Sequence, residues 1–345
     1  MPISITEPYT LTNDASLAAH NTLRVAARAR QLAILRDAGA LEEVLQQLDT
    51  PPLVLGEGSN VLFAGDGERS VLVMATRGVE VEADDNGARI AVAAGEHWDD
   101  FVRWSLGQGY AGLENLILIP GTVGAAPIQN IGAYGAEVAE FVESVEAWDT
   151  RQARVVILDR DACRFGYRDS LFKHECDRYI VTAVRFHLPR QYPLKLDYAG
   201  LRQEIARMGM SRPTPYLVAE AVRTLRTRKL PDPAVIGNAG SFFKNPVVPA
   251  PQAAALKQAH PDMTQWPVDA EHVKLSAAWL IDDAGFKGLR EGDAGISNRH
   301  ALVLVNHGHA SGTDLWAVAT KVIDGVRSRF DVTLEPEPRV IHGRT

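Results

Sequence analysis

Apolar residues recur along this chain with two different spacings, which together predict a mixture of helices and strands. In the first third, short apolar runs alternate with turn residues, whereas Leu41, Val44 and Leu48 recur at helical spacing. Asp85-Asn86-Gly87 supplies turn chemistry between two of the runs. The pattern predicts a helix over 98–106 and strands over 31–37, 51–55, 70–76, 79–84, 88–94, 143–148, 153–158 and 178–187.

The C-terminal part is predicted to form a second unit after a proline-containing stretch. Residues 189–215 contain four prolines and are expected to form a linker or a mobile flap that carries Tyr198. A helix is expected with Thr214 as cap and Pro215 as first helical residue. The other expected elements are a strand over 301–305, a helix from Ser311 or Thr313 to Phe330, and a last strand over 332–334.

The stretch from Asn115 to Gly135 has 21 residues and no charged side chain, but it contains four glycines and two prolines. Such a run is too broken for a helix or strand and too apolar for a solvated loop, so we expect it to turn within the protein. Amide N–H groups in tight turns form a concavity that binds anions such as a dinucleotide pyrophosphate. A buried structural loop joining two layers is the alternative.

A second glycine-rich turn, residues 56–60, follows the apolar residues 53–55 directly and can present N–H groups and a hydroxyl to a phosphate. Because any hairpin could use such a turn, the prediction depends on its combination with residues 121–132. The segment 107–112 matches GxGxxG but follows a predicted helix instead of a strand. We therefore interpret Gly107 and Gly109 as helix termination.

Three further segments carry side chains suited to chemistry, each with a structural alternative. In residues 237–246, Ser241 lies near paired aromatic residues and a lysine, so it is either a proton donor or a turn cap. Arg168 lies in an aromatic turn, where it pairs with an acid such as Asp169 or clamps a substrate carboxylate. Glu337 between two prolines is either a surface turn or a fixed acid.

A basic cluster at the end of the helix that starts at Pro215 also has two interpretations. Arg223, Arg226, Arg228 and Lys229 lie within seven positions of one another. They form either a solvated helix end, with cations near its C-terminus, or an anion-binding group. The sequence leaves both open.

The composition narrows the classes of function. A net charge of −7 argues against nonspecific nucleic-acid binding, which needs a positive surface. Cys163 and Cys176 have no metal-ligand spacing around them, so neither a disulfide framework nor a metal site is expected. No apolar run reaches membrane-spanning length and the N-terminus lacks a signal-peptide pattern, so we expect a cytoplasmic protein that binds no membrane.

Taken together, these motifs resemble the UDP-N-acetylenolpyruvoylglucosamine reductase (MurB) family, in its class with a longer insertion. The resemblance rests on residues 56–63, 119–135, 166–170, 237–246 and 334–337. It implies an α+β fold with a two-lobed FAD-binding domain of the vanillyl-alcohol-oxidase (PCMH) type. The implied ranges are an FAD-binding domain over 1–188 with lobes of about 1–70 and 71–188, a linker or flap over 189–215, and a substrate domain over 216–345, whose last strand returns toward the FAD domain.

The resemblance also implies the reaction and its residues. NADPH would reduce non-covalent FAD, and hydride would then pass to the vinyl carbon of the enolpyruvyl ether on UDP-N-acetylglucosamine, giving UDP-N-acetylmuramate for peptidoglycan. Ser241 would supply the proton, while Arg168 and Glu337 stabilise the enolate-like charge. The implied FAD contacts are Gly56, Glu57, Gly58, Ser59, Asn60, Val61, Ile119, Pro120, Gly121, Thr122, Gly124, Ala125, Ile128, Gln129 and Asn130. The implied substrate contacts are Tyr134, Tyr167, Tyr198, Lys229 and Asn245.

Two departures from the family pattern and two rival functions accompany this expectation. Pro338 follows Glu337 and removes a backbone amide, and Ala125 and Ala126 replace serines of some relatives, so backbone groups would have to contact FAD there. The rivals are a flavin oxidase of the same fold type and a non-catalytic nucleotide-sugar binding protein. A monomer is expected.

Overall fold

The chain folds into two compact units, neither of which is one continuous stretch of sequence. The computed structural model describes residues 7–65, 67–209 and 212–342. Of these, unit 1 takes the residues up to Ala15, Ala29–Glu57 and Arg69–Thr227, and unit 2 takes Ser16–Arg28, Gly58–Glu68 and the residues from Arg228 onward. The domain ranges expected above stay a prediction, and residues 1–6, 66, 210–211 and 343–345 of them lie outside the described residues. The expected α+β class is confirmed.

Unit 1 contains a four-stranded sheet with the strand order β1-β2-β5-β3. The strands expected over 31–37, 51–55 and 70–76 correspond to β2, β3 and β5. Strand β3 runs parallel to β5 and ends directly before the glycine turn at 56–60. The bounds are β1 Tyr9–Ser16, β2 Arg28–Leu35, β3 Leu53–Leu55, β5 Gly67–Met74, η2 Ala38–Ala40 and α1 Leu41–Gln47.

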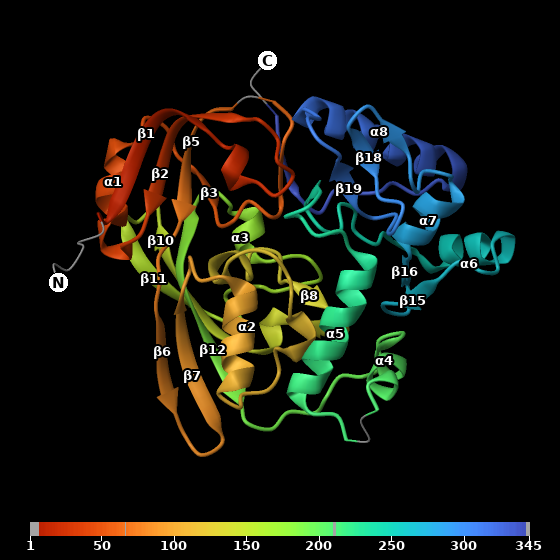
Figure 1. Ribbon diagram of the computed structural model, residues 1–345, viewed down its shortest axis with the longest axis horizontal. Coiled ribbons are helices and arrows are strands. Elements are labelled where there is room, and N and C mark those ends of the chain that lie inside the picture. Colours follow the sequence, from red (N-terminus) through yellow and green to blue (C-terminus); the bar gives the residue numbers. More distant parts are fainter. Residues whose placement is uncertain (1–6, 66, 210–211, 343–345) are drawn as a thin grey trace. The chain divides into compact units, whose positions relative to one another are not determined.

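The larger sheet of unit 1 is antiparallel, with the order β11-β10-β12-β7-β6, and helix α2 lies against it (Figure 1). Apolar side chains join the two layers, because Trp98 and Phe101 of α2 pack on Phe186 of β12, with ring centroids 6.1 and 5.0 Å apart. All five strands and the helix were expected from the sequence. The bounds are β6 Val79–Ala83, β7 Gly87–Ala93, α2 Trp98–Gly107, β10 Val142–Asp149, β11 Arg154–Asp159 and β12 Tyr179–Pro189.

Residues 108–141 connect α2 to β10 through tight turns inside unit 1, as the sequence predicts. Residues 111–117 are buried, and Trp98 Nε1 donates a hydrogen bond to Leu116 O at 2.9 Å. The GxGxxG segment ends α2, and its Gly109 has a φ of 79°, as expected for helix termination. The bounds are η3 Glu114–Leu116, η4 Val123–Ala125, β8 Gly132–Ala133, β9 Ala136–Glu137 and η5 Val138–Glu140.

The stretch 189–215 contains a helix that the sequence pattern did not reveal. Helix α4, Leu201–Arg207, buries Leu201 and Ile205. The residues before it are attached to the rest of unit 1, since Asn115 Nδ2 donates to Lys195 O at 2.9 Å. Helix α5, Pro215–Lys229, begins as expected, with Val218 N donating to Thr214 O at 2.9 Å. The short helix α3 covers Leu171–His174.

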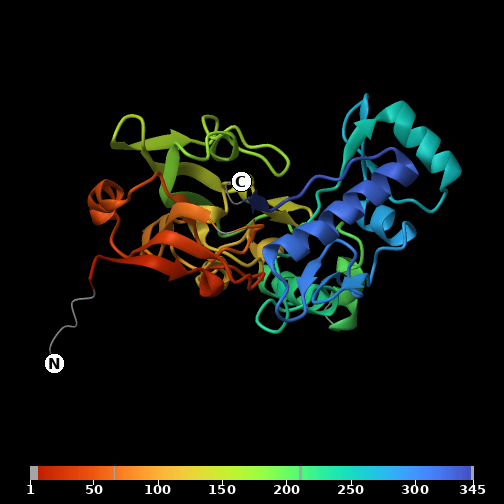
Figure 2. The same ribbon diagram turned by 90° about the horizontal axis from the view of Figure 1, so that it is seen from above.

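Unit 2 contains two small antiparallel sheets, β13-β19-β18-β17 and β14-β16-β15, and a parallel pair formed by β4 and β20. Helix α8 runs beside β18 and β19 (Figures 1 and 2). Ser311 caps this helix, because its Oγ accepts from Asp314 N at 3.1 Å and Asp314 Oδ2 accepts from Ser311 N at 2.9 Å. The bounds are η1 Ala18–His20, β4 Val61–Phe63, β13 Gly237–Asn238, β14 Val247–Pro249, α6 Ala250–Ala259, β15 Gln265–Pro267, β16 His272–Leu275, α7 Ala277–Asp283, β17 Arg290–Glu291, β18 Ala294–Ile296, β19 Leu304–Asn306, α8 Gly312–Phe330 and β20 Arg339–Ile341.

The expected last strand over 332–334 was wrong. Those residues follow α8 as extended chain without strand pairing, and the last strand is β20. Val332 and Leu334 are buried while Thr333 is exposed, which produces the alternating pattern of a strand. Such alternation reports only which side chains face the core. A strand needs a hydrogen-bonded neighbour as well, which β20 finds in β4.

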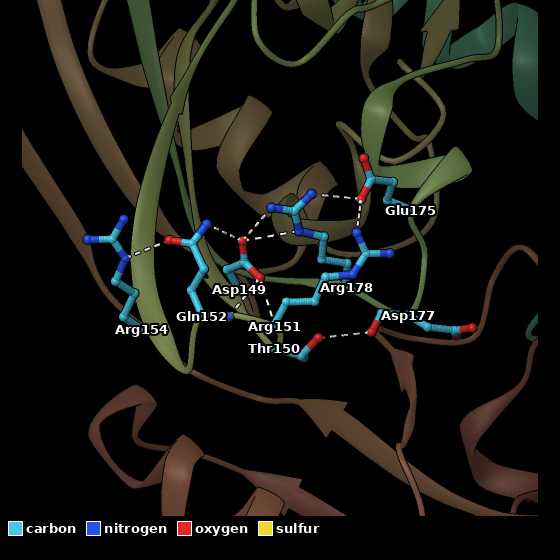
Figure 3. A network of polar contacts seen from close by, with 8 residues as sticks. All are labelled: Asp149, Thr150, Arg151, Gln152, Arg154, Glu175, Asp177 and Arg178. Carbon is cyan, nitrogen blue, oxygen red and sulfur yellow. Dashed lines mark hydrogen bonds and ion pairs between the residues drawn. The ribbon is translucent and has the colours of Figure 1, made fainter.

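A buried ion-pair network fixes the β10–β11 turn to the start of β12 in unit 1 (Figure 3). Arg178 donates from Nη2 to Asp149 Oδ2 at 2.8 Å and from Nη1 to Glu175 Oε2 at 2.9 Å. The backbone N of Arg151 and the Nε2 of Gln152 donate to the two oxygens of Asp149 at 2.9 and 3.0 Å. The Arg178 guanidinium holds the pKa of Asp149 below its usual range, and the backbone amides of Arg151 and Gln152 lower it further.

Candidate functional site

The turn after β3 leaves several backbone donors without a partner in the protein. The amides of Gly56, Glu57, Gly58 and Asn60 make no hydrogen bond to any described residue. Gly58 has a φ of 65°, and a Cβ there would lie 2.0 Å from His20 O, so only glycine fits. Successive free amides in a turn with a left-handed residue form an anion-binding concavity. The turn therefore offers the donors that a dinucleotide diphosphate requires.

Glu57 connects this turn to the second glycine-rich loop within unit 1. Its Oε2 accepts from Gly121 N at 2.8 Å, and its Oε1 contacts His97 Nδ1. A Cβ on Gly56 would lie 2.2 Å from Thr122 Oγ1, so the two loops approach too closely for a larger residue. The structure thus brings together two segments that the sequence predicts separately. The side chain of Glu57 connects the two loops, and its expected contact with FAD stays a prediction.

The inner part of the second loop uses its amides within the protein. Val123 N donates to Glu96 O at 2.8 Å and Gly124 N donates to Ala94 O at 2.9 Å. A Cβ on Gly124 would lie 2.5 Å from Ala94 Cβ, so this glycine serves close packing. The amides of Ala125 and Ala126 donate to Thr122 O and Val123 O. The inner part of the loop is therefore structural, and its outer edge lies against the turn at residues 56–60. Its binding of a dinucleotide stays a prediction.

Three non-glycine residues of unit 1 with expected functional roles have left-handed backbones. Asn130, Tyr134 and Arg168 have φ values of 45°, 50° and 53°. Such conformations cost on the order of 1–3 kcal/mol each and concentrate at functional sites. Tyr134 and Gly135 form the two-residue turn between β8 and β9, and both have positive φ, as type I′ hairpins require.

Hydrogen bonds hold residues 166–170 against residues 128–132. Arg168 Nη2 donates to Gly132 O at 2.6 Å, and Asn130 Nδ2 donates to Gly166 O at 2.9 Å. Ser170 Oγ donates to Ile128 O at 2.7 Å. The structure therefore places the guanidinium of Arg168 beside the end of the loop that was expected to bind FAD.

Three tyrosines with expected substrate roles lie in unit 1, and one of them contacts Arg168. The Tyr134 and Tyr198 rings have centroids 4.6 Å apart, and the Arg168 guanidinium lies 5.4 Å from the Tyr167 ring centroid. Burial raises the pKa of Tyr134 to about 12, so its phenol stays protonated at neutral pH and can donate a hydrogen bond. The exposed fractions of Tyr167 and Tyr198 are 41% and 45%, which leaves both accessible to a ligand.

In unit 2, the structure brings Ser241 and Glu337 onto neighbouring segments. Glu337 N donates to Phe242 O at 2.8 Å, and Phe243 forms a β-bridge with Pro336. The Ser241 hydroxyl makes no hydrogen bond to another described residue, so it does not serve as the turn cap that was the alternative. Pro338 leaves this pairing intact, because the amide of Glu337 before it is bonded.

The other expected substrate residues of unit 2 have different surroundings. Asn245 Oδ1 accepts from Ala277 N at 3.0 Å at the start of α7, which leaves its NH₂ group for a ligand. Lys229 is the last residue of α5 and is exposed. It lies close enough to His300 to help lower the pKa of that imidazole, although burial is the larger cause.

The sequence reasoning missed three residues of unit 1 that belong to these segments. The imidazole of His97 contacts Glu57. Asn115 Nδ2 donates hydrogen bonds to Tyr134 O and Lys195 O. Arg226 lies near Tyr134 and Tyr198. The sequence analysis named Arg226 only as one member of a basic cluster.

In the described residues there is no group of His, Cys, Asp and Glu arranged to hold a metal ion, and no helix of sufficient length and apolarity to cross a membrane.

Comparison with known proteins identifies both halves of the chain. A family model described as "FAD binding domain" matches residues 30–159, and one described as "UDP-N-acetylenolpyruvoylglucosamine reductase, C-terminal domain" matches residues 232–341. UDP-N-acetylenolpyruvoylglucosamine reductase of Xanthomonas campestris pv. campestris (strain B100) is 53% identical, with 96% of this chain and 97% of the relative covered. The Pseudomonas aeruginosa enzyme of that name is 49% identical, with 94% and 97% covered.

A solved structure of the same name agrees with these relatives over nearly the whole chain. UDP-N-acetylenolpyruvylglucosamine reductase (MurB) from Thermus caldophilus superposes with a TM-score of 0.66 at 27% identity, covering 96% of this chain and 98% of that one. The two adjoining glycine-rich segments, the neighbouring segments that carry Ser241 and Glu337, and these full-length matches lead to one conclusion: the chain belongs to the UDP-N-acetylenolpyruvoylglucosamine reductase family.

Proposed function

We propose that this chain reduces the enolpyruvyl ether of UDP-N-acetylglucosamine to UDP-N-acetylmuramate, with FAD as resident cofactor and NADPH as reductant. One structural observation carries the proposal: Ser241 has an unbonded hydroxyl on a segment whose neighbour carries Glu337. When bound, FAD supplies the hydride for the vinyl carbon and takes a replacement from NADPH. The olefin gains that hydride and one proton, which balances the reaction.

In the proposed mechanism, the protein controls the proton and the developing charge. Ser241 Oγ gives its proton to the carbon that bears the carboxylate, and solvent restores it. Arg168 and Glu337 stabilise the enolate-like charge on that carboxylate, since fixed charges and donors act most strongly on charge that appears in the transition state. Serine is a weak acid, so it depends on the charge of the intermediate for its transfer.

The amides of Gly56, Glu57, Gly58 and Asn60, which make no hydrogen bond to a described residue, fit the diphosphate of FAD. The other expected cofactor residues are the proposed contacts to the rest of FAD. Tyr134, Tyr167, Tyr198, Lys229 and Asn245 are the proposed contacts to the sugar nucleotide. The pyrophosphate of FAD is bound by backbone groups in this proposal, because glycine turns allow the closest approach.

A spectroscopic experiment tests the proposed function. Purified protein should be yellow, lose its flavin absorbance with NADPH under anaerobic conditions, and recover it on addition of the enolpyruvyl sugar nucleotide. UDP-N-acetylglucosamine, which lacks the olefin, should cause no recovery. Recovery only with oxygen would indicate the rival flavin oxidase. A colourless protein that does not take up added FAD would favour the rival nucleotide-sugar binding protein.

Glu57→Ala should weaken FAD binding about 10- to 100-fold, because Gly121 N–H loses its charged acceptor and the two loops lose their connection. The dissociation constant can be measured from the recovery of FAD fluorescence on dilution. Glu80→Ala, on the exposed strand β6 of the same unit, is the control and should bind FAD like the wild type. Equal affinities of all three proteins would contradict a connecting role for Glu57.

The proposed reaction also implies a role in the bacterial cell. The product would enter peptidoglycan precursor synthesis in the cytoplasm, so loss of the activity should alter cell shape and block division. We propose that the protein acts as a monomer. Light scattering of the holoenzyme should then give about the chain mass of 37.6 kDa, and twice that mass would contradict it.

A further inference from the structure

Arg226 of helix α5 is partly buried, and its charge has no partner among the described residues. It follows the buried residues Ala219 and Val222 by seven and four positions, which places all three on one helix face. Its Nε atom is buried and makes no hydrogen bond, and no ion pair to its guanidinium is found among the described residues. A guanidinium whose Nε is buried without a hydrogen bond loses part of its hydration, which is costly, so such groups are normally paired.

Other arginines of unit 1 illustrate the difference. Arg223 lies one turn earlier on the same helix and pairs with Glu220. Arg178 is paired with both Asp149 and Glu175. Arg226 therefore departs from the pattern that this chain follows where an arginine has only a structural role.

Four groups act on the charge of Arg226, and three of them, Tyr134, Tyr198 and Arg168, are residues expected at the substrate. Burial lowers the pKa of its guanidinium, Tyr134, Asp99 and Tyr198 raise it, and Arg168 lowers it as a like charge. Asp99 is the only carboxylate among these groups, and its two oxygens already accept from Leu118 N at 2.5 Å and Arg103 Nε at 2.7 Å. Both oxygens of Asp99 are thus already bonded to donors other than Arg226.

We propose that Arg226 is a second anion-binding group of the substrate site, which binds an oxyanion of the sugar nucleotide beside Tyr134, Tyr198 and Arg168. A planar guanidinium suits oxyanions because it can donate two parallel hydrogen bonds. The protonated phenol of Tyr134 adds a neutral donor. The two interpretations of the basic cluster at the end of α5 then apply to different residues. Arg223 belongs to the solvated helix end, and Arg226 binds an anion.

This inference rests on the proposed function, which supplies two sources of the oxyanion. The diphosphate is present in every UDP-sugar, whereas the lactyl carboxylate is present in UDP-N-acetylmuramate and absent from UDP-N-acetylglucosamine. The two compounds are therefore matched probes, since they share the diphosphate and differ at the carboxylate. Both can be titrated into oxidised holoenzyme by calorimetry.

Arg226→Gln should weaken the binding of UDP-N-acetylmuramate by about 10- to 100-fold, the range expected for a lost charge-assisted hydrogen bond. An equal loss for UDP-N-acetylglucosamine assigns the oxyanion to the diphosphate, and a loss confined to UDP-N-acetylmuramate assigns it to the carboxylate. Arg226→Lys keeps the charge and should keep part of the affinity. Arg223→Gln is the matched control on the same helix and should bind both compounds like the wild type.

Unchanged affinities in Arg226→Gln overturn the inference, and so does an equal loss in Arg223→Gln. The FAD content and thermal unfolding of each variant show whether the fold is kept. A shift of the flavin midpoint potential in Arg226→Gln without any loss of ligand affinity also overturns it, because the guanidinium would then act on the flavin. Wild-type protein that binds neither compound overturns the proposed function itself, which distinguishes the two failures.

Discussion

Ser241→Ala should leave the reduction of the flavin by NADPH at the wild-type rate and slow its reoxidation by the enolpyruvyl sugar nucleotide by about 1,000-fold. The magnitude is that of a lost general acid, whose contribution is typically 10²- to 10⁴-fold. The proton is needed only when the olefin is reduced, so only the second half-reaction should suffer. Stopped-flow absorbance under anaerobic conditions measures the two half-reactions separately.

The control for this experiment is Ser328→Ala, because Ser328 is exposed on helix α8 of the same unit. It should match the wild type in both half-reactions. Equal slowing of both half-reactions in Ser241→Ala would contradict the assignment, since a general defect in FAD binding or folding affects them alike. A solvent isotope effect on reoxidation that disappears in the variant would support proton transfer from the hydroxyl.

Sequence patterns predicted most elements of this fold because local periodicity and burial agree there. Leu41 and Val44 are buried on one face of α1, as their spacing indicates. Ser311 and Thr313 were the two candidate caps for α8. Ser311 is the cap, because it forms reciprocal hydrogen bonds with Asp314. Where periodicity and hydrogen bonding diverge, as at Val332 and Leu334, the same reasoning predicted a strand that does not form.

The motifs of the candidate site could be predicted from the sequence. The tertiary contacts that join these motifs could not be predicted. The glycine turns could be found because glycine and proline interrupt helices and strands, and the role of Ser241 was implied by the resemblance of its segment to a family motif. The link from Glu57 to Gly121 joins residues 64 positions apart, and no local signal reveals it. Arg226 looked like one member of a basic cluster. The burial of its Nε atom depends on how α5 packs within unit 1, which is a tertiary property.

The Asp149 network is a second feature that depends on tertiary structure, and it is expected to dominate the local stability of unit 1. The side chain of Asp149 is 1% exposed, and it accepts hydrogen bonds from Arg178, Arg151 and Gln152 (Figure 3). Removal of one partner from a buried charged network leaves the other charge without compensation, which is more costly than loss of an exposed pair. Asp149 is therefore the most sensitive position of the network.

Asp149→Asn should lower the free energy of unfolding by about 2 kcal/mol at neutral pH, measured by urea denaturation at saturating FAD. The folded state holds the pKa of Asp149 below its usual value, chiefly through Arg178, so its contribution is fully present above about pH 4. It is lost as the pH falls through the depressed folded-state pKa. The difference between wild type and variant should therefore shrink below about pH 4.

Glu175→Gln is the matched control, because Glu175 bonds the same arginine but has a side chain that is 29% exposed. Its loss should be smaller at every pH, since solvent screens the more exposed carboxylate. Other carboxylates with depressed pKa values, such as Asp84 and Asp293, are unchanged in both variants and cancel from the difference. A stability difference for Asp149→Asn that persists undiminished at low pH would mean that packing, and not the carboxylate charge, holds β12 to the β10–β11 turn.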